Sequence, residues 1–346
     1  MNTNRNLIRV NLQQFANPNT NVTTDTGLTH EMKTFYEKML IKTAEEELIF
    51  DQFGQKKPIP AHGGRTIEFR KYSPFAKALT PLTEGVTPDG HKITMSTITA
   101  TAAQFGDYVT LSDRLILEAI DDNIVEATEL SGSQAGRTLD TVTRDIVSAG
   151  TNVLYAPAGT TAVTTRANLT MASVITSDLI LKAATILRTN IAKKIDGNYV
   201  AIVHPHVAEI LKKDPKFISW NQYTTPEKYW KGEIGSIHGV RIIENAEAKI
   251  INDNTCPVKT AAAGSNPAEY YSVYATVIFG ADAYGVTEIE GGGLQHIVKQ
   301  LGSGDDPLNQ RATVGWKATK TAERLVDAHI VRIESLTEFS ASQGAN

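Results

Sequence analysis

The segment Thr66-Ile67-Glu68-Phe69-Arg70 alternates polar and apolar side chains, and so does Lys92-Ile93-Thr94-Met95-Ser96-Thr97-Ile98-Thr99. This period of two predicts two β-strands. Between them, residues 74–90 contain three prolines and two glycines, so an irregular tip is expected. Residues 59–108 are therefore predicted to be a long hairpin. Its low apolar content is typical of an excursion that buries no core of its own and needs a partner surface.

Charges of both signs are mixed along this hairpin. The basic side chains are Arg65, Arg70, Lys71, Lys77 and Lys92, and the acidic ones are Glu68, Glu84, Asp89 and Asp107. A surface on which the charges nearly cancel suits contact with another protein better than contact with phosphate.

The segments before the hairpin differ from one another. Residues 1–28 are rich in Asn and Thr and are predicted to be an extended arm, ordered only on another surface. Residues 29–58 contain apolar side chains at helical spacing, which predicts a helix over about 29–50. Gly54 and Pro58 close it.

A run of helices is expected after the hairpin. Ser112 is placed to cap a short helix over 113–120, and a long helix is predicted over about 124–150. Apolar side chains recur in that helix at Ala135, Leu139, Val142, Ile146 and Ala149. This 4-3-4-3 spacing is typical of a helix with one packed face, here a spine against a sheet.

From residue 176 onward the pattern alternates helices with short apolar strands. One helix is predicted over 177–197, capped by Ser177, and another after the turn His204-Pro205. The predicted strands are 199–203, 239–243, 273–279, 286–289, 294–301, 312–320 and 324–334. The predicted loops are 157–172 and 250–269, and 336–346 is predicted to be a free tail. The fold class is therefore α+β.

Length and composition exclude several functional classes. The 346 residues suit two domains of about 150 residues each. The net charge of −4, from 34 basic and 38 acidic side chains, argues against a dedicated nucleic-acid binder. No apolar run approaches the roughly 20 residues that span a bilayer, and the N-terminus lacks the apolar core of a secretory signal. One cysteine excludes an internal disulfide, so we expect a soluble protein in a reducing compartment.

No motif in the sequence requires a cofactor or a catalytic site. Nucleotide-binding glycine patterns are absent, and Gly291-Gly292-Gly293 precedes a strand where a phosphate loop would precede a helix. His204 and His206 suit a metal site less well than a strand-to-helix turn, because zinc needs further ligands. Asp305-Asp306 is favoured as a solvated turn over a calcium site. Cys256 is interpreted as an incidental thiol.

Three further stretches carry a resemblance to a known family. They are Tyr199-Val200-Ala201-Ile202-Val203-His204-Pro205, Ile278-Phe279-Gly280-Ala281-Asp282-Ala283-Tyr284-Gly285, and Asp306-Pro307-Leu308-Asn309-Gln310-Arg311 continuing through Val314-Gly315-Trp316-Lys317. Together with the order of the parts, they resemble the N4-like major capsid proteins of tailed phages, which have the HK97-type fold. The resemblance covers about residues 28–335.

The resemblance implies a division of the chain into the parts of that fold. These are an N-terminal arm (1–28), an N-terminal helix (29–58), an E-loop (59–108), a first part of the P-domain with the spine helix (109–176), an A-domain (177–284), the P-domain strands (285–335) and a C-terminal tail (336–346). The turn at 302–310 would lie at local threefold contacts.

The resemblance also implies a function. It predicts a non-enzymatic subunit, without cofactor or metal, that assembles in the host cytoplasm into hexamers and pentamers of an icosahedral virion shell around double-stranded DNA. DNA contact would be non-specific and no membrane would be involved. Portal, scaffolding and decoration proteins are candidate partners. The candidate inter-subunit contacts are Arg65, Arg70, Lys77, Glu84, Asp305, Asp306, Asn309 and Arg311.

Two other functions remain open from the sequence. An encapsulin-like bacterial compartment shares the fold, although encapsulins usually begin with a helix and this chain begins with an Asn- and Thr-rich arm. An α/β enzyme with residues 59–108 as a lid over His204 and His206 is the second alternative.

Overall fold

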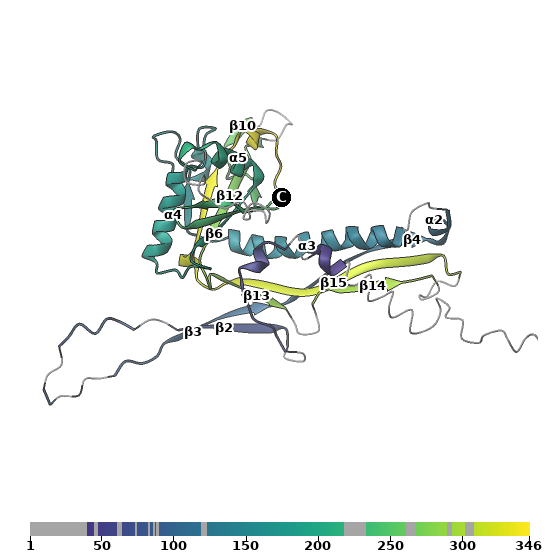
Figure 1. Cartoon of the computed structure of the whole chain (residues 1–346), viewed down its shortest axis with the longest axis horizontal. Helices are drawn as coiled ribbons and strands as arrows, with labels where there is room; N and C mark the ends of the chain where they lie inside the picture. The colour runs from purple at the N-terminus through teal and green to yellow at the C-terminus, as the bar shows by residue number, and fades with distance from the viewer. Residues whose placement is uncertain are drawn as a thin grey trace, which may run out of the picture.

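The structure is a computed structural model of the whole chain. It describes residues 40–346 except 45–47, 61–63, 73–74, 82–83, 86, 88–89, 119–122, 218–232, 261–267, 289–292 and 302–307. The chain forms an α/β head at one end of a long helix, a strand-rich body under that helix, and a hairpin that extends beyond the body (Figure 1). The predicted arm at 1–28 lies outside the described residues.

A seven-stranded sheet forms the centre of the head. Its order is β5 (Val153–Tyr155), β16 (Ile330–Ser335), β12 (Val273–Phe279), β6 (Tyr199–Val203), β8 (Val240–Glu244) and β7 (Glu233–Ile237), with β9 (Ile250–Ile251) beside β12. Every residue of β6 and of β12 is buried. Such continuous apolar runs are typical of strands that are covered on both faces.

The two faces of this sheet are covered by different parts of the chain. On one face, Tyr199, Ala201 and Val203 share a core with helices α4 (Ser177–Thr189) and α5 (Pro205–Lys213). On the other face, Val200 and Ile202 pack with Phe50 and with Val147 near the end of the long helix. The alternation of side chains along β6 therefore joins the head to the body.

The body is a second sheet with the long helix α3 (Asn123–Ser148) on one face. Its order is β1 (Gln55–Lys56), β13 (Tyr284–Glu288), β15 (Arg311–Arg324) and β14 (Gln295–Lys299), and β4 (Ala103–Ser112) also pairs with β15. Trp316 and Ala318 of β15 pack against Ala135 and Leu139 of the helix. The predicted spine helix is confirmed, and so is its packed face at Ala135 and Leu139. Farther along, Val142 and Ile146 are only half-buried, and Ala149 is exposed beyond the end of the helix, because Thr143, Arg144 and Val147 take the buried positions.

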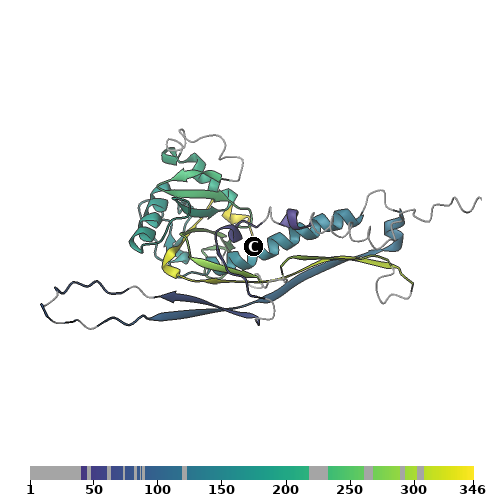
Figure 2. The ribbon, with the colours of Figure 1, turned by 60° about the horizontal axis from the view of Figure 1, so that its bottom comes forward.

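The hairpin consists of β2 (Thr66–Tyr72) and β3 (Met95–Thr101), paired antiparallel from Thr66 with Thr101 to Tyr72 with Met95. Figure 2 shows it extending away from the body past the head. The remaining short elements are α2 (Asp113–Glu118), β10 (Val258–Thr260), β11 (Glu269–Tyr270) and the 3-10 turns η2 (Phe50–Gln52), η3 (Arg166–Asn168), η5 (Asp327–His329) and η6 (Glu338–Ala341). Among the described residues, none of the helices combines the length and apolarity that a membrane crossing requires.

Several predicted helix ends are wrong. The helix expected over 29–50 is described only at 40–44, and Phe50 begins a 3-10 turn because its N–H donates to Asp140 of α3 at 2.8 Å. Helix α4 ends at Thr189 and not near 197, since Ile191 adopts a left-handed φ of 55° that stops the helix. Its N-terminus is capped from a distance: Ser177 N–H and Oγ–H both donate to Asp214.

The last strand differs from its prediction in both limits and partners. Strand β15 continues to Arg324, a turn with η5 follows, and β16 begins only at Ile330. The resemblance places this strand among the P-domain strands, 285–335. It pairs instead with β12 in the head, from Phe279 opposite Ile330 to Tyr274 opposite Ser335. Single-strand periodicity carries no information on which sheet a strand joins, which is why this partner was missed.

Two segments predicted to be irregular are partly ordered on the head. Within 250–269, β9 pairs with β12, and β10 pairs with β11. The expectation that 336–346 is a free tail is wrong. Leu336 and Ser340 are buried, and the Asn346 side chain donates to Ala248 O at 2.9 Å and accepts from Ile250 N at 2.8 Å.

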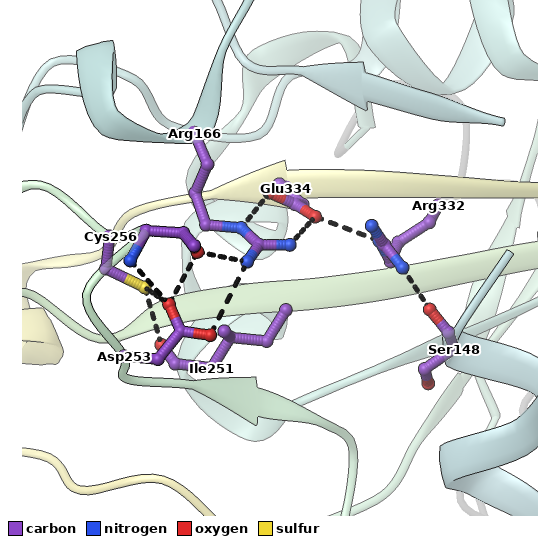
Figure 3. A network of polar contacts seen from close by, with 8 residues as sticks. Ser148, Arg166, Ile251, Asp253, Cys256, Arg332 and Glu334 are labelled. Carbon is purple, nitrogen blue, oxygen red and sulfur yellow. Dashed lines mark hydrogen bonds and ion pairs between the residues drawn. The ribbon is translucent and has the colours of Figure 1, made fainter. Parts of the chain in front are cut away.

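A buried ion network holds the head loops to β16 (Figure 3). Glu334 is fully buried and accepts two hydrogen bonds of 2.7 Å from Arg166 and one of 2.9 Å from Arg332. Arg332 also donates to the carbonyl of Ser148 at the end of α3. The Glu334 carboxylate raises the pKa of Arg166, so this guanidinium group stays charged. Loop, sheet and spine helix are thereby fixed around one carboxylate.

Removal of one partner from this network should destabilise the fold. Arg166→Ala leaves the Glu334 charge buried with Arg332 alone, so we expect a loss toward the lower end of roughly 3–5 kcal/mol in the free energy of urea unfolding. The matched control is Arg114→Ala, because Arg114 pairs with Glu118 in solvent, with side chains 80% and 62% exposed. Its stability should change little. Equal stability of the two variants would contradict the structural role of the network.

A close approach of β4 to β15 gives a second test. A Cβ on Gly315 would lie 2.7 Å from Tyr108 Cβ and 2.8 Å from the carbonyl of Asp107, closer than such atoms normally come. Gly315→Ala should therefore lower the stability of the protein by about 1–3 kcal/mol in thermal unfolding. Gly344→Ala, where no atom lies within 4 Å, should leave the unfolding temperature unchanged. An unchanged temperature for both variants would show that the strands separate easily.

Candidate assembly surfaces

The base of the hairpin packs on its own chain. Ile67, Phe69, Ala100 and Ala102 are buried in one cluster that Leu325 adjoins. The Phe69 ring lies where a Cβ on Gly285 would meet it at 2.6 Å, so the ring rests directly on the backbone of β13. The expectation that 59–108 buries no core of its own is therefore wrong for the base. In addition, residues 103–108 belong to β4 and pair with β15.

The outer part of the hairpin has apolar side chains that its own chain does not cover. The exposed fractions are 62% for Tyr72, 58% for Phe75, 82% for Leu79, 72% for Ile93 and 46% for Met95. The Phe75 ring stacks on the His91 ring, with ring centres 6.0 Å apart. A concentration of exposed apolar side chains at one end of a molecule is typical of a protein-contact surface.

A second surface with exposed apolar side chains lies on the body sheet. A groove of about 990 Å³ lies over β4, β14 and β15. Tyr108 is 70% exposed and Ile297 41% exposed at this groove. Three cationic side chains, Lys299, Arg311 and Lys317, also line it. The carboxylate of Asp107 turns to the other face, where it accepts a hydrogen bond of 2.7 Å from Gln134 of α3.

The candidate contact residues divide between the two ends of the molecule. Arg65, Arg70, Lys77 and Glu84 are exposed on the hairpin, and Asn309 and Arg311 are exposed at the start of β15. The tip of the hairpin and the start of β15 lie toward opposite ends of the molecule (Figure 1). Asp305 and Asp306 lie outside the described residues. Sequence reasoning missed the exposed apolar side chains at the tip and Tyr108, because it weighed charges and did not locate surface aromatics.

His204 and His206 form part of the head packing. His204 is the N-cap of α5 and accepts from His206 N at 3.2 Å, while burial lowers the pKa of its imidazole to about 4. His206 Nδ1 lies 2.7 Å from the Tyr274 hydroxyl, and its ring stacks on Phe339. Within the described ranges, the histidine, cysteine and acidic side chains form no group of three that could hold a metal ion. The strand-to-helix turn predicted here is confirmed.

A second buried cluster connects the segment before the hairpin to the spine helix. Asp140 of α3 accepts hydrogen bonds from Phe50 N at 2.8 Å and from Asn245 Nδ2 at 3.2 Å. Asp51 accepts from Thr143 Oγ1 at 2.7 Å and contacts the ammonium of Lys320. Burial raises the pKa of the Asp140 carboxyl to about 6, and the charge of Asp51 adds to the shift.

This shift makes the stability of the body depend on pH. Because the pKa of Asp140 is raised to about 6, above the ordinary value of an aspartate, the folded state keeps a proton that the unfolded chain releases. The contribution of this group to the free energy of unfolding therefore falls as pH rises from about 4 to about 6. Asp140→Asn cannot ionise, so its loss of stability over this range should be smaller by on the order of 2–3 kcal/mol.

Urea unfolding of the unassembled protein at pH values across this range measures the difference. Asp107→Asn is the control, because the Gln134 hydrogen bond lowers the pKa of that exposed carboxyl. Asp107 therefore remains ionised over most of the range, and the variant should keep the wild-type slope. Parallel curves for wild type and Asp140→Asn would contradict the assignment.

Comparisons with solved structures identify the fold. The Ralstonia phage GP4 capsid matches with a TM-score of 0.61 and 14% identity over 83% of this chain and 87% of that chain. The cyanophage P-SCSP1u capsid matches with a TM-score of 0.58 and 13% identity over 84% and 89%. A virus-like particle from Pyrococcus furiosus matches with a TM-score of 0.50 and 10% identity over 88% and 99%. The expected α+β, HK97-type capsid fold is confirmed.

The family follows from sequence. No curated protein matches the chain. A family model described as phage capsid protein matches residues 95–326, which is more than half of the chain. That family consists of structural proteins of the virion shell, so the enzyme alternative is set aside by the match and not by missing motifs. We conclude that the chain belongs to the phage capsid protein family, whose members assemble with further copies of themselves into the capsid shell of a virion.

Proposed function

We propose that this chain is the major capsid protein of a tailed phage of the N4-like group, arranged as hexamers and pentamers around double-stranded DNA. The family match and the fold support the capsid role. The three stretches that resemble N4-like proteins support the subgroup. The net charge of −4 supports a shell that repels packaged phosphate, so that DNA contacts the shell only non-specifically.

In this proposal the parts of the chain take the roles implied by the HK97-type fold. Residues 1–28 act as the arm, the hairpin within 59–108 as the E-loop, and 177–284 as the A-domain at the centre of each hexamer or pentamer. Helix α3 and the body strands act as the P-domain, and the turn at 302–310 meets its counterparts at local threefold positions. Portal, scaffolding and decoration proteins are the further partners of such a shell.

The single observation that carries the proposal is the uncovered apolar outer part of the hairpin. Tyr72, Phe75 and Leu79 are largely exposed, and they belong to the hairpin that extends beyond the body (Figure 2). The groove beside Tyr108 on a second copy offers aromatic and apolar surface of the same kind. Insertion of one hairpin into the groove of the next copy is a heterologous contact, and such contacts generate rings when they close.

The charged candidate contacts fit the same arrangement. Glu84 near the tip is matched by the cationic rim of the groove, Lys299, Arg311 and Lys317. Lys77, Arg65 and Arg70 pair with carboxylates elsewhere on a neighbouring copy. Asp305, Asp306, Asn309 and Arg311 serve contacts at the opposite end. Mixed charges at such a rim set the register of partners more than they add affinity.

Charge placed at the tip should stop assembly without unfolding the subunit. Phe75→Asp combined with Leu79→Asp should abolish particles in negative-stain electron microscopy and shift the protein to subunits in sedimentation. The desolvation of two carboxylates in the contact opposes docking, whereas both positions are exposed in the subunit. The unfolding temperature of the subunit should stay that of wild type.

Ile191→Asp is the matched control. Ile191 is 85% exposed on the head and outside the hairpin, and aspartate tolerates its left-handed backbone. This variant should still form particles. Normal particles from the doubly charged hairpin would contradict the proposal. Particles that carry a co-purified enzyme and no DNA would favour an encapsulin-like compartment.

A further inference from the structure

One buried amine lies against one buried carboxylate in the body. Lys320 of β15 is 1% exposed, and its Nζ contacts Oδ2 of Asp51 directly. The same Nζ donates to the carbonyl of Leu139 at 3.1 Å, which holds it in place. Phe50, Leu139 and Tyr284 are buried around this site. A lysine held so deep in apolar surroundings is unusual, since the cost of removing both charges from water often exceeds their attraction.

The groups around this pair are placed for a condensation reaction. Thr143 Oγ1 donates to Oδ1 of Asp51 at 2.7 Å, so the two oxygens of this carboxyl have different partners. Oδ1 faces a hydroxyl donor, and Oδ2 faces the amine. A second carboxyl, that of Asp140, lies close enough for its ionisation to respond to both Asp51 and Lys320. Amine, acyl carbon, oxyanion donor and proton carrier thus occupy one closed site.

We propose that Lys320 and Asp51 become joined by an intramolecular isopeptide bond between Nζ and Cγ. Thr143 stabilises the developing oxyanion on Oδ1, and Asp140 transfers the proton. The two reacting groups are already fixed against each other, so little entropy is lost on the way to the transition state. Reaction removes one positive and one negative charge from the interior and leaves a neutral amide, which relieves the desolvation cost of the ion pair.

The atoms balance without any further reactant. The ammonium of Lys320 first gives one proton to Oδ2 of Asp51, which leaves a neutral amine and a neutral carboxylic acid. The nitrogen lone pair then attacks Cγ, and negative charge develops on Oδ1, where Thr143 donates its hydrogen bond. A second proton leaves the nitrogen and reaches Oδ2 through Asp140. The Cγ–Oδ2 bond breaks, one water is released, and Asp140 returns to its starting state.

The bond would connect residues that are 269 positions apart in the sequence. Asp51 follows the N-terminal segment and precedes the hairpin, whereas Lys320 lies in the strand that carries most of the body sheet. A covalent link at this point keeps the segment before the hairpin attached to the body when the hairpin is pulled from outside. It is independent of the proposed capsid geometry, because every contact involved lies within one chain.

Intact-mass spectrometry under denaturing conditions tests the proposal. Wild-type protein, measured both as subunits and as assembled particles, should be lighter than its sequence mass by one water. A protease digest should contain one branched peptide that joins the segments around Asp51 and Lys320. Lys182→Met, at an exposed position of helix α4, is the control and should retain the loss of mass.

Three variants locate the chemistry. Lys320→Met and Asp51→Ala should both have their full sequence mass. Asp140→Asn should form the link about 100-fold more slowly, as expected when a proton carrier is removed. The full sequence mass for folded wild-type protein in both states would overturn the proposal and leave only an ion pair. A loss of water that persists in Lys320→Met would overturn it as well, whether or not particles form.

Discussion

The shell-forming role depends on apolar side chains of the outer hairpin that remain exposed in the single subunit. The hairpin is anchored where Phe69 rests on Gly285, and beyond that point no layer of the described chain lies beneath it. Two strands without a packed face are only marginally stable in water. A second copy that covers Phe75 and Leu79 would therefore stabilise the outer strand pairs of the hairpin. Assembly and ordering of the hairpin become one process.

The rest of the molecule is built to hold this hairpin at a fixed place. Strand β15 pairs with β4, β13 and β14, and so it is the central strand of the body sheet. Strand β3 of the hairpin is followed directly by β4, with one residue, Ala102, between them. The base of the hairpin packs beside Leu325, just after β15. Helix α3 runs along this sheet and meets the head through Val147, where Glu334 and its two arginines fix the loops. A force on the hairpin is thus transmitted to the head through rigid elements.

Much of the fold could be predicted from local pattern. The alternation at 66–70, the all-apolar strands at 199–203 and 273–279 and the long helix from about 124 all depend on the burial of neighbouring side chains, which a sequence displays directly. The capsid family could be recognised from the order of the parts and from short stretches such as that beginning at Asp306. The limits of α4 could not, because Asp214 caps its start and Ile191, not a glycine, ends it.

The buried polar groups were also beyond the reach of sequence reasoning. Asp51, Asp140 and Lys320 lie far apart in the chain, and each resembles any surface charge until the fold brings it inside. The same holds for the last residues, since Asn346 is fixed by backbone groups of residues 248 and 250. Contacts between distant residues carry no local signature. For this reason the sequence prediction failed for strand partners, for helix ends and for charged side chains that are buried.

Amide hydrogen exchange of the hairpin strands, measured in dissociated subunits and in assembled particles, tests the central claim most directly. If a second copy covers the outer hairpin, the amides of Lys71, Tyr72, Met95 and Ser96 should exchange rapidly in the subunit and slowly in the particle, whereas those near Ile67 and Ala100 should be protected in both. Equal protection of the outer amides in both states would mean that the hairpin is stable alone and would contradict the account.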